Sequence, residues 1–295
     1  MADVKLNNGY AIALGNFDGL HIGHMAVLDK TLEQAKNGLK AAVMLFDEHS
    51  MKDITGEAPP KLITDSERAG IFEEKGLETF IVNFSQIKDF SPEEFFEKIL
   101  TEKLNAKAVV CGFYYRFGQK AKGDAKLLEE MCIKNGVDCV IIDEVITDGL
   151  PVSSTAIRKA VECGDIGKAN RMLGRKFGYC AEVINGDKRG RTWGFPTINQ
   201  KLPDGLAVPQ FGVYESIVTV DGKNYKGVTN IGLRPTVGTD CILSETHIIS
   251  FEGDLYGRCV DVRLVKFMRQ EKKFGSFDEL IKQIKSDVCC VKGGV

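Results

Sequence analysis

Short apolar runs alternate with amphipathic segments along the first half of the chain. Apolar runs of this length are typical of buried strands, whereas the segments between them repeat apolar side chains at helical spacing. We expect strands at residues 10–14, 41–46, 79–82, 108–111 and 138–142, and helices at 24–37, 64–75, 91–104 and 125–135. This alternation predicts a Rossmann-like parallel sheet with helices on both faces, whose ligands bind at the carboxyl ends of the strands.

Local signals mark where several helices begin. Ser91 can cap the helix expected at 91–104, with Pro92 at its first position and acidic residues in its first turn. Residues 153–173 are expected to form two short helices, and Asp165 can cap the second of them.

After Gly174 the pattern changes to strands separated by turn residues. We expect strands at 177–184, 212–220, 225–231, 246–251 and 260–267, and no further helix until 277–286. Asp221–Gly222 is a hairpin signal. The second half therefore predicts a mainly antiparallel β-barrel with one C-terminal helix, and we place the two domains at 1–174 and 175–295.

Composition narrows the classes of function. The net charge is −2, and basic residues are scattered among acidic ones, so we expect no nucleic-acid partner and only local anion binding. No apolar run approaches the roughly 20 residues that span a bilayer, and the first residues do not resemble a signal peptide. Nine dispersed cysteines without a CxxC pair indicate buried free thiols in a reducing compartment. We therefore expect a cytoplasmic protein without a membrane partner.

The segment GNFDGLHIGH, residues 15–24, lies between the first expected strand and helix. Its glycines let the backbone approach a ligand closely, and the helix N-terminus favours an anion. His21 and His24 can face the same phosphates and donate hydrogen bonds to them. A turn with exposed histidines is the alternative, and a metal site is weaker because no third ligand follows at characteristic spacing. The candidate nucleotide-binding residues are Gly15, Asn16, Phe17, Asp18 and Gly23.

A second glycine-rich segment, residues 186–199, contains three basic residues and suits phosphate binding. Thr197 and Asn199 are two apart, so their side chains point to the same side of an extended chain. Their neutral oxygens can hold Mg²⁺ together with phosphates and water. The alternative is a hairpin with a basic tip. The candidate nucleotide-binding residues here are Gly186, Arg189, Gly190, Arg191, Gly194 and Pro196.

Glu245, Thr246 and His247 are expected to open a strand. Glu245 would act as a general base if its carboxylate reaches a substrate hydroxyl, although a lone glutamate is usually a surface residue. We interpret His247 as structural.

The segment GNFDGLHIGH resembles the HxGH motif of the nucleotidyltransferase superfamily. In that superfamily a phosphate attacks the α-phosphate of a nucleoside triphosphate, and pyrophosphate leaves. VSSTAIR, residues 152–158, resembles the second motif of the superfamily, ISSTxxR. Its hydroxyls, on Ser153, Ser154 and Thr155, can cap a helix, and Arg158 can reach the departing phosphates. Taken alone, the segment would be an ordinary helix cap.

Six motifs in order resemble the bacterial bifunctional riboflavin kinase/FMN adenylyltransferase (FAD synthetase) family. They are GNFDGLHIGH, VSSTAIR, GRTWGFPTIN, ETH, DLYG and RQEKKF. The resemblance implies that the C-terminal domain phosphorylates riboflavin with ATP, giving FMN. It also implies that the N-terminal nucleotidyltransferase domain adenylylates FMN with a second ATP, giving FAD and pyrophosphate.

The resemblance also implies roles for single residues. His21, His24 and Arg158 would act in adenylyl transfer, and Thr197 and Asn199 would hold Mg²⁺ and ATP phosphates. Glu245 would take the proton from the riboflavin 5′-hydroxyl. The implied flavin-binding residues are Asp47, His49, Arg269 and Glu271.

Two departures from the family lie in the first domain. The family's FDPHP motif is FDEHS here, residues 46–50, and Tyr114 stands where the family has Asp or Asn. Tyrosine cannot replace a short carboxylate or amide in the same geometry. One alternative is therefore a riboflavin kinase whose adenylyltransferase domain is weak or inactive. Another is a non-catalytic flavin- or nucleotide-binding protein, which predicts loss of Thr197, Asn199 or Glu245, and all three are present.

Overall fold

The computed structural model describes residues 9–36, 38–47, 56–186, 194–236 and 239–293. The chain forms two compact units: Met1–Pro59 with Asp65–Ser153, and Pro60–Thr64 with Ser154–Val295. The two short helices after residue 153 cluster with the second unit. Each unit is described by itself.

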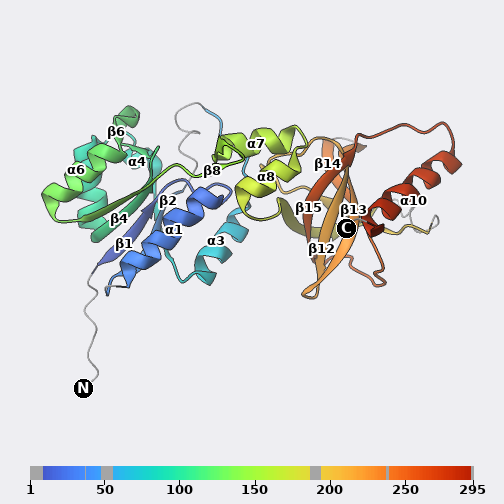
Figure 1. The fold of residues 1–295 in the computed structure, drawn as a ribbon, viewed down its shortest axis with the longest axis horizontal. Coiled ribbons are helices and arrows are strands. Elements are labelled where there is room, and N and C mark those ends of the chain that lie inside the picture. The colour runs from blue at the N-terminus through green and yellow to red at the C-terminus, as the bar shows by residue number, and fades with distance from the viewer. Residues whose placement is uncertain (1–8, 37, 48–55, 187–193, 237–238, 294–295) are drawn as a thin grey trace, which may run out of the picture. The chain divides into compact units, whose positions relative to one another are not determined.

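The first unit is built on a five-stranded parallel sheet (Figure 1). Its strand order is β3 (Glu78–Val82), β2 (Lys40–Phe46), β1 (Tyr10–Leu14), β4 (Ala106–Gly112) and β7 (Asp138–Ile142). All five predicted strands are confirmed to within two residues at each end. The carboxyl ends of neighbouring β1 and β4 are aligned, with Leu14 opposite Cys111. The glycine segment that follows β1 therefore lies at the ligand-binding edge of the sheet.

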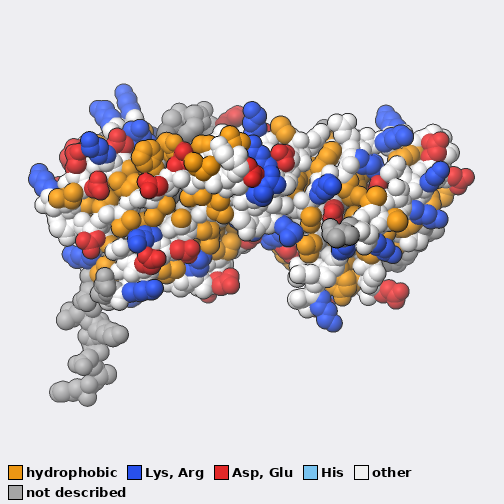
Figure 2. Space-filling model, in the orientation of Figure 1, with side chains coloured by type: hydrophobic (Ala, Val, Ile, Leu, Met, Phe, Trp, Pro, Cys, Tyr) orange, Lys and Arg blue, Asp and Glu red, His pale blue; other side chains and the backbone are white. Residues whose placement is uncertain are grey.

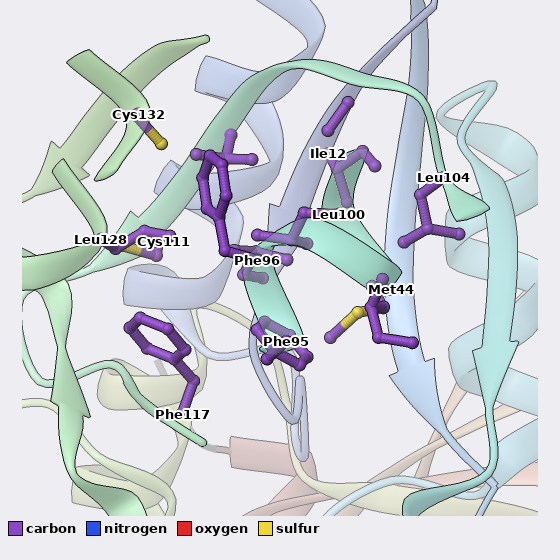
Figure 3. Close-up of a cluster of buried hydrophobic side chains, with 14 of the residues drawn as sticks. Ile12, Met44, Phe95, Phe96, Leu100, Leu104, Cys111, Phe117, Leu128 and Cys132 are labelled. Carbon is purple, nitrogen blue, oxygen red and sulfur yellow. The ribbon is translucent and has the colours of Figure 1, made fainter. Parts of the chain in front are cut away.

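Helices cover both faces of this sheet. An ion pair at 2.8 Å joins Asp29 of α1 (Ile22–Ala35) to Lys75, the residue that follows α3 (Asp65–Glu74). On the other face, α6 (Ala125–Asn135) and a helix at Phe95–Lys103 pack on the sheet. Figure 3 shows their contact, where phenylalanine, leucine and cysteine side chains meet Ile12 of β1 and Met44 of β2.

The helix predicted at 91–104 begins as expected but has a different winding. Ser91 and Glu94 form a reciprocal capping box around the short α5 (Pro92–Glu94). The chain then continues as the π-helix η1 (Phe95–Lys103). The Thr101 hydroxyl donates to the Phe96 carbonyl, five residues earlier, at 3.0 Å. The same five-residue spacing defines the wide turns of a π-helix, which apolar periodicity does not distinguish from an α-helix.

Short elements complete the first unit. They are α4 (Phe84–Ile87), β5 (Arg116–Phe117), η2 (Gln119–Ala121), β6 (Gly123–Asp124), β8 (Ile146–Thr147) and β9 (Leu150–Pro151).

The second unit is a closed antiparallel barrel, as predicted. Its strand order is β10 (Gly178–Ile184), β11 (Thr197–Lys201), β14 (Thr239–Ile248), β13 (Lys223–Thr236), β12 (Gly212–Val220) and β15 (Cys259–Arg269). Asp221 and Gly222 form the predicted hairpin turn, with φ values of 49° and 74°. The start of one strand was predicted wrongly. It was expected near Glu245, but β14 begins at Thr239, and Glu245 lies near its end.

Hydroxyl side chains fill part of the barrel interior. Thr229 donates to Ser216 at 2.7 Å and lies 2.9 Å from the hydroxyl of Thr246, and all three residues are fully buried. Gln200, also fully buried, donates to the carbonyl groups of Ala181 and Val260.

Three helices pack on the barrel unit. In α8 (Ile166–Leu173), Asp165 is the N-cap as predicted, and Asn170 donates to the Leu264 carbonyl of β15 at 2.9 Å. α8 packs against α7 (Ser154–Glu162). The C-terminal α10 (Phe277–Gly293) lies beside β13 (Figure 1) and buries Val288 and Val291 there.

The surface and the cysteines complete the comparison with the sequence. Lys and Arg side chains are interspersed with Asp and Glu on the face that Figure 2 shows.

All nine cysteines are free thiols, but only Cys111 and Cys132 are buried, so the expectation of buried thiols was wrong for the others. Burial raises the pKa of Cys111 to about 12. Among the described residues, no helix is long and apolar enough to cross a membrane.

An ion pair attaches α10 to the barrel. The Arg269 guanidinium donates from Nη2 to Asp287 at 2.7 Å and from Nε at 3.1 Å, and Asp287 is 4% exposed. We expect Asp287→Ala to lower the free energy of unfolding of this unit by about 3 kcal/mol, because it leaves a half-buried guanidinium without its carboxylate. Urea unfolding followed by circular dichroism measures this. Asp204→Ala, which removes the exposed ion pair with Lys201, is the control and should change little. Equal effects of the two substitutions would contradict the prediction.

Candidate active sites

The loop between β1 and α1 is held in a strained conformation by buried side chains. Phe17, Gly19 and Leu20 all have positive φ, at 50°, 81° and 41°. Phe17 and Leu20 are nevertheless buried, and the Phe17 ring packs edge-on against Phe72 of α3. Asp18 is 5% exposed. Strain of this kind persists only where the surroundings fix the backbone, so the loop is a preorganised platform.

His21 and His24 stack on each other at the start of α1. Their ring centroids are 3.6 Å apart and nearly parallel. His21 is the N-cap, and its Nδ1 accepts the backbone N–H of His24 at 3.2 Å. Because Nδ1 is an acceptor, Nε2 carries the proton of the neutral ring and can donate to a phosphate oxygen. A Cβ on Gly23 would lie 3.2 Å from the His21 ring, so this glycine makes room for the stack.

The remaining predicted residues of the glycine segment lie around this platform. Gly15 follows β1 directly, with the Phe17 ring 3.3 Å from where its Cβ would be. The backbone carbonyl of Asn16 accepts from Arg68 of α3 at 3.5 Å. Among the described residues, no three His, Cys, Asp or Glu side chains are grouped to hold a metal ion.

The second expected motif, residues 152–158, lies at the start of α7. Ser153 is the last residue of the first unit, and Ser154, Thr155 and Arg158 belong to the second. Arg158 Nε donates to the carbonyl of Pro60, at 2.7 Å, within that unit. Most of this motif therefore belongs to the second unit, whereas the histidine pair belongs to the first.

The implied flavin residues of the first unit have protein partners. Asp47 accepts from the side chain of Asn83 at 2.6 Å and from the backbone N–H of Phe84 at 3.0 Å. His49 lies outside the described residues. Tyr114, just beyond β4, is 70% exposed and donates to Glu144 at 2.5 Å. That hydrogen bond raises the pKa of Tyr114.

In the barrel, the strand register brings Asn199 and Glu245 together. The two residues are directly opposite on β11 and β14, so their side chains lie on the same face. Thr197 lies opposite His247 on that face. His247 Nδ1 donates to the Pro196 carbonyl at 2.9 Å, which agrees with a structural role for this histidine.

The residues that precede β11 are described only in part. Arg189, Gly190 and Arg191 lie outside the described residues, whereas Gly194 and Pro196 are described and exposed. Gly186 lies two residues beyond the end of β10 and packs against Asn199. A Cβ there would be 2.4 Å from the Asn199 amide nitrogen.

Asn199 fits the predicted role in holding a cation. The residue is 7% exposed, and its side-chain oxygen Oδ1 is buried without a hydrogen-bond partner among the residues that the structure describes. An unsatisfied buried oxygen is costly, and a bound ion relieves that cost. Amide and hydroxyl oxygens are suitable ligands for Mg²⁺ when phosphates and water complete its coordination.

The end of β15 and the middle of β13 supply further polar groups, and one of them, Asn230, was not predicted from the sequence. Arg269 is bound to Asp287 of α10, and Glu271 accepts from the side chain of Asn230 at 3.1 Å. Asn230 is opposite Glu245 on β13. No local pattern marks Asn230, because its place beside Glu245 depends on the strand register.

Family models match both halves of the chain. The FAD synthetase family model matches residues 3–156, and the riboflavin kinase family model matches residues 173–293. A bifunctional riboflavin kinase/FMN adenylyltransferase from Pseudomonas fluorescens is 33% identical over 97% of this chain and 93% of its own length. The Bacillus subtilis protein of the same name is 34% identical over 94% of this chain and 89% of its own.

The chain belongs to the bifunctional riboflavin kinase/FMN adenylyltransferase family.

A solved structure shares the fold of this family member. It is a crystal structure described as a macrolide-efflux protein from Streptococcus pneumoniae, with 30% identity and a TM-score of 0.88. The match covers 99% of this chain and 97% of that one.

The contact between Gly186 and Asn199 gives a prediction. Gly186→Ala should displace the Asn199 amide and lower ATP-dependent phosphorylation of riboflavin at least about tenfold, because misplaced ligands lose transition-state alignment. Steady-state rates with riboflavin and ATP measure this. Gly167→Ala in α8, where a Cβ has ordinary contacts, is the matched control. Comparable rates for the two variants would contradict the role of Gly186.

Proposed function

We propose that the chain makes FAD in two steps. The barrel unit phosphorylates riboflavin with ATP to give FMN, and the parallel-sheet unit adenylylates FMN with a second ATP, releasing pyrophosphate. The observation that carries the kinase assignment is the register that pairs Asn199 with Glu245. The full-length similarity to relatives named for both activities supports the two steps together.

In the kinase step, Glu245 would accept the proton of the riboflavin 5′-hydroxyl as that oxygen attacks the γ-phosphate. Asn199 lies directly opposite Glu245, and Thr197 lies two residues before Asn199 on the same strand. Both side chains would hold Mg²⁺ and position the phosphates. When bound, Mg²⁺ neutralises charge on the β- and γ-phosphates. The lone buried oxygen of Asn199 supports this assignment.

In the adenylyl step, the protein would align two phosphates and supply no nucleophile. The stacked His21 and His24 would donate to the triphosphate at the N-terminus of α1, where the helix dipole also favours negative charge. The family resemblance also assigns Ser153, Ser154, Thr155 and Arg158 to adenylyl transfer. The substrates are thus riboflavin, FMN and ATP, and the nine free thiols support a cytoplasmic location.

The first test separates the kinase step. Purified protein with riboflavin, ATP and Mg²⁺ should give FMN and FAD by chromatography, and absence of both products would exclude the proposal.

Glu245→Gln removes the base and should lower FMN formation about 10²-fold or more. Conversion of added FMN to FAD should remain, because Glu245 has no proposed part in adenylyl transfer. Equal loss of both activities would contradict two independent sites.

The second test separates the adenylyl step. His24→Ala removes one donor of the stacked pair and should lower conversion of FMN to FAD about 10²-fold. Formation of FMN from riboflavin should remain at the rate of the unaltered protein. Undiminished FAD formation would remove His24 from the site. FMN without FAD in the unaltered protein would favour the narrower kinase, in which Tyr114 replaces the family's Asp or Asn.

A further inference from the structure

Three cysteine side chains gather in the core of the parallel-sheet unit, where α6 packs on the sheet. Cys111 lies on β4, Cys132 on α6 and Cys139 on β7, and Figure 3 shows the first two. Cys111 and Cys132 are fully buried, whereas Cys139, on an edge strand of the sheet, is partly exposed. The proposed reactions use none of these thiols.

The end of α6 folds the chain so that Cys139 returns to the side of Cys132. Gly136 has a φ of 67° and ends the helix, and the backbone N–H of Val137 donates to the Cys132 carbonyl at 3.0 Å. This left-handed cap turns the chain directly into β7. Cys139 then packs on the same core that contains Cys132.

The side chains of Cys132 and Cys139 are hydrogen-bonded to each other. That bond raises the pKa of Cys132 and lowers the pKa of Cys139, so Cys132 is the donor and Cys139 the better nucleophile. Burial is the main cause that raises the pKa of Cys111, which makes that thiol unreactive. The pair therefore consists of a partly exposed, nucleophilic thiol and a buried thiol in contact with it.

We propose that Cys139 and Cys132 are a redox-sensitive pair that closes to a disulfide when the protein meets a low-molecular-weight disulfide. The Cys139 thiolate attacks one sulfur of the reagent, whose sulfur–sulfur bond breaks, and the first departing thiolate takes up the proton that Cys139 has lost. Cys132 then attacks the Cys139 sulfur of the mixed disulfide, and its proton passes to the second departing thiolate. Two protein thiols are oxidised, and one disulfide is reduced to two thiols.

The fold favours closure of the pair over a lasting mixed disulfide. Cys132 is already in contact with the sulfur that it must attack, so the second step is intramolecular and needs no further encounter. The new bond would fasten the last turn of α6 to β7, an edge strand that pairs with β4.

Oxidation of the full-length protein with glutathione disulfide tests the pair. After alkylation of the remaining thiols and proteolysis, mass spectrometry should find Cys132 joined to Cys139, and dithiothreitol should restore both thiols. In Cys132→Ala the resolving thiol is missing, so Cys139 should keep one glutathione. In Cys139→Ala, Cys132 should stay a free thiol, because it is fully buried.

The matched control is Cys163→Ala, which removes an exposed thiol of the other unit and should leave the rate of closure unchanged. Three results would each overturn the proposal: both thiols unmodified after oxidation, a lasting glutathione adduct on Cys139 of the unaltered protein, or a bond from Cys139 to Cys111. Reaction of Cys132 in the Cys139→Ala variant would do the same.

Oxidation in urea separates the effect of the fold from that of sequence spacing. At fixed concentrations of glutathione and its disulfide, the fraction of Cys132 joined to Cys139 should fall at least about threefold once the chain is unfolded, because the fold no longer holds the thiols in contact. An equal fraction in the folded and unfolded protein would contradict a pair positioned by α6 and β7.

Discussion

The register of three barrel strands is the constraint on which the kinase site depends. The hydroxyls of Ser216, Thr229 and Thr246 meet inside the closed barrel and fix how β14 pairs with its neighbours. A shift of one residue would turn these hydroxyls outward and bring the outward side chains into the core. The same register places Glu245 between two amides on the outer face. The buried network thus positions these outer side chains without touching them.

In the parallel-sheet unit, different interactions hold the candidate site rigid. Its candidate site is a loop at the end of β1, where sheet register alone does not fix side-chain positions. Burial of Phe17 and Leu20 holds the positive φ angles of the loop, and the N-cap bond of His21 orients the first ring. Stacking then aligns His24 with it. Strain and capping provide here the rigidity that strand pairing provides in the barrel.

The sequence predicted elements where local patterns were strong and missed those that depend on distant partners. The five parallel strands and the Asp221–Gly222 turn follow from apolar runs and turn chemistry. The early start of β14, at Thr239, was missed. Asn199 and Glu245 were recognised by residue type, but their pairing, and with it Asn230, requires the register. Long-range pairing of this kind leaves no periodic trace in the chain.

Three glycines show how the structure changes an interpretation based on sequence. Glycines in such segments are expected to let a ligand approach the backbone. Here Gly23, Gly186 and Gly232 each lie against a candidate functional side chain of the protein itself: His21, Asn199 and Glu271. None of the three has a positive φ, so backbone freedom does not explain them. Each glycine instead leaves space for a catalytic or binding side chain. A methyl group at any of these positions would displace that side chain from its place.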